Sequence, residues 1–165
     1  MHLTTQPAAA LAPFSRFLDE HRDLVWRFLV ASVGPVEADD CFQETWVAAL
    51  RAYPRLRPDS NARAWLLTIA HRKAIDAHRR RARQAFPVAD LEGLAGAGAP
   101  PPPPRDDALW DAVHALPPRQ RAAVLLRHNA DLPHREIAEI LGCSEDAARN
   151  ALHAGLTTLR KVVTP

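Results

Sequence analysis

Residues 72–83 carry side chains that could bind phosphate. The segment reads RKAIDAHRRRAR and holds six Lys or Arg against one Asp. Dense cationic side chains bind nucleic acid by displacing the counterions around its phosphates. The alternative is a solvated helix end whose cations favour the C-terminal dipole, and this accounts for one or two of the six. The segment therefore indicates a surface for nucleic acid.

The helix that must position these cations is expected to begin near Asn61. The run Asp59-Ser60-Asn61 offers side chains that can cap a helix. The apolar residues that follow recur at three-to-four spacing, which predicts a packed face opposite the cations. They are Trp65, Leu66, Ile69 and Ile75.

Composition is that of a small protein with its positive charge in the N-terminal half. Apolar residues make up 47% of the 165 residues, enough for a core, and the net charge is only +2. Residues 14–84 carry 13 Lys or Arg and 9 Asp or Glu, whereas residues 106–165 carry 7 and 8. The N-terminal half is therefore the electrostatic candidate for DNA.

No residue pattern points to a metal, a cofactor or an enzyme. Cys41 and Cys143 lack CxxC partners and zinc-spaced histidines, so we expect reduced thiols. His71 and His78, seven residues apart, are expected to meet phosphate or water rather than a metal. There is no Gly-rich phosphate loop, HExxH or GxSxG. We therefore expect no catalysis.

The expected location is the cytoplasm. No apolar run approaches the ~18 residues of a membrane span, so we expect no membrane insertion. The first residues lack a basic stretch followed by an apolar one, so they do not resemble a secretory signal.

Residues 85–105 are expected to divide the chain into two modules. The segment contains three glycines and the prolines 100–104, which predicts a linker rather than a helix. Residues 14–84 and 106–165 show only helical periodicity. We therefore predict an all-α fold of two small helical modules joined by a Gly/Pro-rich linker, with a disordered tail over residues 1–13.

The second module contains the pattern of a helix-turn-helix. Ile137, Ala138 and Leu141 are expected to pack inward, and residues 142–144 read Gly-Cys-Ser, a tight turn. Ser144 can cap a last helix that runs to about residue 163. A short helix, a glycine turn and a second helix are typical of a DNA-binding helix-turn-helix.

Three segments, in this order, carry a family resemblance. They read EADDCFQETWVAALRAYPRL, NARAWLLTIAHRKAIDAHRRRAR and LPPRQRAAVLLRHNADLPHREIAEILGCS. The chain resembles the extracytoplasmic-function (ECF) group of the sigma-70 family of bacterial RNA polymerase sigma factors. That group keeps region 2 and region 4 joined by a linker, so the resemblance implies region 2 over residues 14–84 and region 4 over residues 106–165. It also implies a protein that binds core polymerase, directs it to promoters, and helps open the DNA, under the control of an anti-sigma factor.

The resemblance assigns two sets of residues in region 2. The resemblance assigns docking on the polymerase β′ clamp to an acidic helix with the residues Asp39, Asp40, Gln43 and Glu44. The alternative is that this is simply an exposed, charged helix face without a partner. The resemblance assigns contact with the minus-ten element to Asn61, Trp65, Arg72, Asp76, Arg79, Arg80, Arg81 and Arg83. For Trp65, core packing is the stronger interpretation, and the four arginines would hold phosphates.

Region 4 departs from the family pattern. The resemblance assigns the minus-thirty-five element to Arg149, Asn150 and His153. The family usually has basic residues where this chain has Ala151 and Ala154. A glycine at position 155 should cost a helix about 1 kcal/mol against alanine. We therefore expect region 4 to read DNA weakly and to serve also by packing on the polymerase β flap.

Two other functions remain open from the sequence. One is a helix-turn-helix regulator that acts without core polymerase, although such a protein has no need of the acidic helix. The other is a sigma-like protein that binds polymerase or an anti-sigma factor but no longer recognises promoters, which the alanine-rich recognition helix supports.

Overall fold

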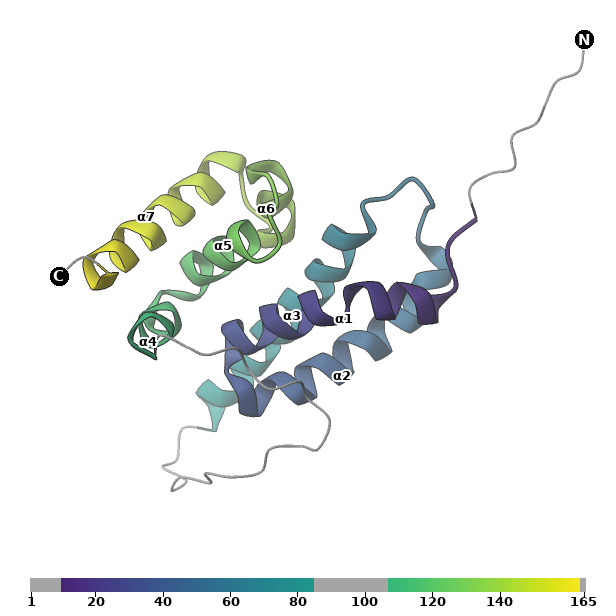
Figure 1. The fold of residues 1–165 in the computed structure, drawn as a ribbon, viewed down its shortest axis with the longest axis horizontal. Coiled ribbons are helices and arrows are strands. Elements are labelled where there is room, and N and C mark those ends of the chain that lie inside the picture. Colours follow the sequence, from purple (N-terminus) through teal and green to yellow (C-terminus); the bar gives the residue numbers. More distant parts are fainter. Residues whose placement is uncertain (1–9, 85–106, 164–165) are drawn as a thin grey trace, which may run out of the picture.

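The computed structural model describes residues 10–84 and 107–163, and every regular element within these two ranges is helical (Figure 1). The first range contains α1 (Phe14–Val33), α2 (Pro35–Ala52), the 3-10 turn η1 (Tyr53–Arg55) and α3 (Ala62–Arg83). The second contains α4 (Asp107–Ala115), α5 (Pro118–His128), α6 (His134–Leu141) and α7 (Glu145–Val163). The predicted all-α fold is confirmed.

Helices α1, α2 and α3 pack as a three-helix bundle, which we call module 1. Its core takes the apolar stripe of each helix, as helical periodicity requires. Val25, Phe28 and Leu29 of α1 meet Leu66 and Leu67 of α3 in this core, and all five are fully buried. Gly34 separates α1 from α2 with a φ of 85°, a conformation that a side chain rarely adopts.

The described part of the chain begins four residues before α1. Leu11 packs against the core, and Tyr53 Oη donates a hydrogen bond to the Ala12 carbonyl at 2.6 Å. Residues 11 and 12 of the expected disordered tail over residues 1–13 are therefore held against module 1, whereas residues 1–9 lie outside the described residues. The expected linker, residues 85–105, lies wholly outside the described residues.

Helices α4 to α7 form the second bundle, module 2, and its helix-turn-helix is confirmed. Gly142 ends α6 in the left-handed region at φ 64°, and Cys143 N–H donates to the Ala138 carbonyl at 3.0 Å. Ser144 Oγ then accepts from Ala147 N–H at 3.1 Å, the predicted cap of α7.

Gly155 has a packing role that its cost to the helix conceals. A Cβ at this position would lie 2.8 Å from Val124 Cγ2 and 3.3 Å from the Gln120 carbonyl oxygen. Only glycine lets α5 and α7 approach this closely. The helix-propensity cost expected of Gly155 is therefore accompanied by a packing requirement for glycine at this position.

The two modules pack against each other. Helix α1 contacts α4 and α5, and α3 contacts α6, as Figure 1 shows. One buried apolar cluster runs through both modules. In this structure, module 2 therefore shares a core with module 1.

Candidate functional site

The exposed side of α2 presents acidic and amide side chains. Asp39, Asp40 and Gln43 are all exposed, and Gln43 Nε2 donates to Asp39 Oδ2 at 3.3 Å. The helix begins at Pro35, which follows a left-handed glycine and suits the first turn. Three of the four residues expected to dock on polymerase therefore lie together and open to solvent.

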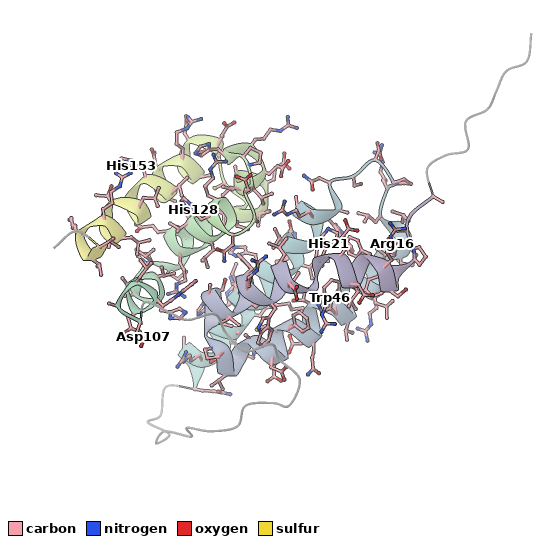
Figure 2. The ribbon with its side chains drawn as sticks, in the orientation of Figure 1. Arg16, His21, Trp46, Asp107, His128 and His153 are labelled. Atoms are coloured by element: carbon pink, nitrogen blue, oxygen red, sulfur yellow. The ribbon has the colours of Figure 1, made fainter. Side chains whose placement is uncertain are left out.

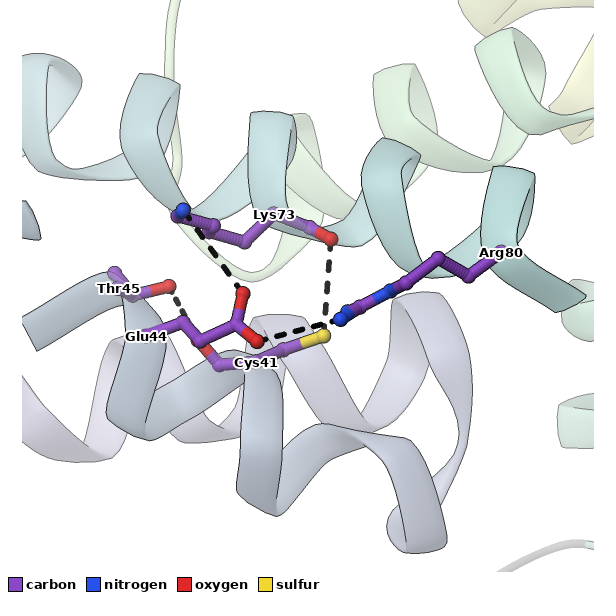
Figure 3. Close-up of polar contacts among 5 residues, drawn as sticks. All are labelled: Cys41, Glu44, Thr45, Lys73 and Arg80. Atoms are coloured by element: carbon purple, nitrogen blue, oxygen red, sulfur yellow. Dashed lines mark hydrogen bonds and ion pairs between the residues drawn. The ribbon is translucent and has the colours of Figure 1, made fainter.

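Glu44, the fourth, turns toward α3 instead. Its Oε1 lies 3.4 Å from Arg80 Nη1, and its Oε2 lies 3.9 Å from Lys73 Nζ (Figure 3). Beside it, Cys41 is buried, and burial, with the nearby Glu44 carboxylate, raises the pKa of the Cys41 thiol to about 11. The structure thus separates Glu44 from the exposed set and makes it a link between two helices.

Three exposed apolar side chains extend the α2 face. Val36, Val47 and Leu50 have exposed fractions of 79%, 48% and 54%. They share one side of the helix with Asp40 and Gln43, because positions 36, 40, 43, 47 and 50 recur every three to four residues. Our reading of the sequence missed them as functional residues, although the same spacing is visible in the printed chain.

Helix α3 begins where the sequence predicted. Asn61 Oδ1 accepts a hydrogen bond from Ala64 N–H at 3.0 Å, so the side chain caps the helix. Asn61 is nevertheless exposed, and its amide N–H groups are available to another partner. One side chain can therefore start the helix and face a ligand.

The arginines of α3 divide into two groups. Arg72, Arg79 and Arg83 are exposed and make no ion pair within the described residues. They lie on one side of α3 with Asp76, because positions 72, 76, 79 and 83 follow helical spacing. We call these four residues the open stripe.

Arg80 and Arg81 form the second group and are engaged by carboxylates of α2. Arg80 pairs with Glu44, and Arg81 Nη1 lies 3.7 Å from Glu37 Oε1. These two arginines help line a hollow between α2 and α3 together with Glu37 and Asp40. The expected run of phosphate-binding arginines is therefore split by the acidic residues of the neighbouring helix.

Trp65 has one packed side. Its ring centroid lies 6.1 Å from that of Phe17 and 6.4 Å from that of Tyr53. The residue is nevertheless only partly buried. Core contact on one side thus leaves ring surface accessible on the same end of α3 as Asn61.

A third side of α3 carries histidines and faces the second bundle. Burial, with His78 and Arg72 nearby, lowers the pKa of His71 to about 4. Burial and the Arg121 guanidinium lower the pKa of His78, whose Nε2 lies 3.3 Å from Arg121 Nη1. The expectation that His78 meets phosphate or water is therefore wrong, because α5 covers it. Within residues 10–84 and 107–163, no group of three His, Cys, Asp or Glu is placed to hold a metal ion.

The last helix presents a different kind of polar face. Asn150 and His153 are exposed, and Figure 2 places His153 on the side of α7 turned away from α1–α3. Arg149 is held at both ends of its guanidinium, by Glu145 Oε1 at 3.2 Å and by Asp146 Oδ1 at 3.2 Å. The one arginine of this face is thus neutralised within its own helix.

The alanines of α7 are packing residues. Ala151 is 9% exposed and belongs to the core, and Ala154 is partly buried. An arginine at position 151 would therefore displace the core instead of adding a contact to DNA. The interpretation of Ala151 as a lost basic contact is wrong for this reason.

Comparison with known protein families matches both modules. The family "Sigma-70 region 2" matches residues 17–84, and the family "Sigma-70, region 4" matches residues 106–159. No helix of the described residues is long and apolar enough to cross a bilayer.

Curated relatives match across most of the chain. The ECF RNA polymerase sigma factor SigD of Mycobacterium tuberculosis is 34% identical over 155 residues, with 87% of this chain and 73% of the relative covered. The RNA polymerase sigma factor CarQ of Myxococcus xanthus is 31% identical over 155 residues, with 91% and 88% covered.

Solved structures show the same fold. The sigma factor RpoE of Bartonella quintana, crystallised with the anti-sigma factor NepR, gives a TM-score of 0.75 at 21% identity, with 91% of this chain and 96% of that chain covered. CnrH, in complex with the cytosolic domain of CnrY, gives a TM-score of 0.65 at 21% identity, with 91% and 86% covered.

Proposed function

The chain belongs to the ECF group of the sigma-70 family of RNA polymerase sigma factors, and we propose how its two modules divide the work of promoter recognition. Sigma factors bind core polymerase and promoter DNA, and they are initiation factors rather than catalysts in themselves. Module 1 acts as region 2, and module 2 acts as region 4. The chain itself performs no chemistry, and it works in the cytoplasm beside the polymerase.

Core polymerase docks on the exposed side of α2. Asp39, Asp40 and Gln43 supply charge and hydrogen bonds, and Val47 and Leu50 supply apolar contact on the same side. Nearly half or more of each apolar side chain is open to solvent. Protein interfaces combine such an apolar centre with a polar rim. The partner is the β′ clamp, to which the family resemblance assigns this helix.

The minus-ten element meets the open stripe of α3. Arg79 and Arg83 hold phosphates, while Arg72 and Asp76, which lie one turn apart and nearer the start of the helix, contact bases. Asn61 and Trp65 lie nearer the start of α3, where an unstacked base could be received. Base stacking on an aromatic ring contributes about 1–3 kcal/mol per base. The open stripe is the single observation that carries this proposal, because its cations have no carboxylate partner within the described residues.

Module 2 binds the minus-thirty-five element of the promoter and the β flap of the polymerase. Arg149, Asn150 and His153 face outward from the second helix of a helix-turn-helix, which is the position of base-reading side chains in this motif. Relatives in solved structures are bound to the anti-sigma factor NepR and to the cytosolic domain of CnrY. We expect an anti-sigma factor for this chain as well.

A second candidate function is a sigma-like regulator with weakened promoter recognition that acts mainly through protein partners. The observation that favours it is the double pairing of Arg149 with Glu145 and Asp146. A guanidinium that is already satisfied is a weaker reader of guanine.

Run-off transcription with core polymerase on genomic promoters tests both candidates. The first predicts transcripts that depend on this chain and vanish with Arg72→Gln plus Arg79→Gln. The matched control is Arg16→Gln plus Arg22→Gln, two exposed arginines of α1 outside the proposed surfaces. Co-purification with core polymerase without any specific transcript would instead support the second candidate.

A further inference from the structure

Arg121 joins the two modules through contacts that the proposed function does not use. It lies on α5 and is partly buried. Its Nη1 donates to the Ser32 carbonyl of α1 at 2.9 Å and lies 3.3 Å from His78 Nε2 of α3. Both contacts cross from module 2 to module 1.

The same guanidinium also binds the end of α4. Nε donates to the Val113 carbonyl at 3.2 Å, and Nη2 donates to the Leu116 carbonyl at 3.0 Å and to the His114 carbonyl. The carbonyls at a helix C-terminus carry partial negative charge. The last turn of α1 has no basic residue of its own. Arg121 therefore supplies one cation to the ends of two helices that belong to different modules.

No carboxylate shares Arg121 within the described residues. Its N–H groups donate hydrogen bonds to backbone carbonyls and face a neutral histidine. A half-buried charge satisfied in this way depends on every partner staying in place, because loss of one leaves a desolvated donor. The contact is thus specific to the packed arrangement of the modules.

In the packed arrangement, the proposed DNA-binding surfaces of the two modules lie too close together to reach both promoter elements. Helix α3 contacts α6, which directly precedes α7. At ~1.5 Å per residue, α6 and α7 together reach about 40 Å from that contact. The minus-ten and minus-thirty-five elements lie ~25 base pairs apart, which is about 85 Å at 3.4 Å per base pair. Both modules cannot occupy their elements while they are packed together.

We propose that Arg121 is a latch that holds the two modules closed, and that its release from Ser32 and His78 precedes promoter binding. The latch is a property of the free chain, and only its inhibitory effect rests on the proposed function. Arg121 acts as a positioning residue and does not itself contact DNA.

The test is the distance between the modules in the full-length chain. Spin labels are placed at Glu20→Cys on α1 and Lys161→Cys on α7, both exposed, in a Cys143→Ser background. Cys41 is buried and its pKa is raised, so it stays unlabelled. Double electron–electron resonance then reports the closed and open populations.

Three variants and a control test whether changes at Arg121 and His78 shift the open-to-closed ratio in the expected direction. Arg121→Gln and His78→Lys should each raise the open-to-closed ratio about tenfold or more, by the loss of a charged hydrogen bond or by repulsion. His78→Glu should lower this ratio, because it gives Arg121 a carboxylate. Arg119→Gln, exposed on the same helix, should leave the ratio unchanged. Circular dichroism confirms that each variant is folded, and His78→Lys tests the interface without removing the contacts of Arg121 to α4.

Closed distances in both Arg121→Gln and His78→Lys would overturn the latch, and so would opening by His78→Glu. A second measurement separates the latch from the function. With core polymerase present, the two opening variants should bind a promoter that carries both elements more tightly than the wild type. Opening without any gain in promoter affinity would overturn the inhibitory role, whereas failure of the wild type to support transcription would overturn the proposed function and leave the distances standing.

Discussion

Helices α3 and α7 are both expected to contact DNA, yet their arginines are held in different ways. On α3, carboxylates of the neighbouring α2 engage Arg80 and Arg81 and leave the open stripe free. On α7, Glu145 and Asp146 of the same helix engage the only arginine of the reading face. The comparison shows that the number of cations on a helix is a poor measure of its affinity for phosphate. What counts is which carboxylates reach them.

The largest expected effect separates the two arginine groups of α3. Replacing Arg72, Arg79 and Arg83 by Gln should reduce the salt dependence of promoter binding by roughly two units, since Arg79 and Arg83 each hold a phosphate and each phosphate contact contributes about 0.9. Replacing Arg80 and Arg81 by Gln should reduce it by about one unit or less. The measurement is polymerase–promoter affinity over a range of salt concentrations.

The control for this experiment is binding of core polymerase without DNA. It should be unchanged in the triple variant, because the open stripe lies apart from the exposed side of α2. Equal slopes for the triple and the double variants would show that the division between paired and free arginines has no bearing on DNA.

The next effect concerns the packing of α7 against α5 at Gly155. Gly155→Ala should destabilise the protein by about 1–3 kcal/mol, because the new methyl group meets Val124 and overpacking exceeds the gain in helix propensity. Urea unfolding measures this change. Thr157→Ala, at an exposed position of α7, serves as the control and should change stability by well under 1 kcal/mol. A stabilised Gly155→Ala variant would contradict the close contact between α5 and α7.

Acid should weaken the face of α3 that carries histidines. The pKa of His71 is lowered to about 4 in the folded chain, so its neutral form is favoured there. A lowered histidine pKa stabilises the fold above the unfolded value of about 6.5, and this stability is lost as pH falls from 6.5 toward 4. The loss at pH 5 should be about 1–2 kcal/mol.

The groups that face these histidines determine whether the histidine pKa is raised or lowered. His78 lies near Arg121 of α5, Arg81 of α3 and Glu37 of α2, and the cations together with burial outweigh the carboxylate. Urea unfolding between pH 7 and pH 5 measures the loss. His71→Gln, which cannot titrate, should flatten the dependence, and an unchanged slope in this variant would assign it to other groups.

Local features of the fold were predictable from the sequence because they depend on neighbouring residues. Asn61 and Ser144 cap their helices as expected, and Gly142 forms the expected turn. Each is fixed within four residues along the chain. The helical periodicity that places apolar residues inside is equally local.

Contacts between helices could not be predicted in the same way. Arg79 and Arg80 are adjacent in sequence, yet only Arg80 meets Glu44, because successive side chains differ by about 100° around a helix and the position of α2 decides which is reached. Gly155 costs helix propensity, and only the position of α5 shows that a side chain there would meet Val124. Arg121 has no local pattern at all, since its partners lie on three other helices. The helix that carries each candidate residue was therefore predictable, whereas the contacts between these residues were not.

The smallest expected effect tests the α7 side of the comparison. Glu145→Gln with Asp146→Asn should free Arg149 and remove two negative charges from the reading face. Binding to a promoter with a minus-thirty-five element should tighten, and the salt slope should steepen by roughly one unit if Arg149 then meets a phosphate. Adding Arg149→Gln to this pair should cancel the gain, which separates release of the arginine from a general loss of repulsion. A gain that survives Arg149→Gln would mean that the carboxylates merely repel DNA, and α7 would then differ from α3 in net charge alone.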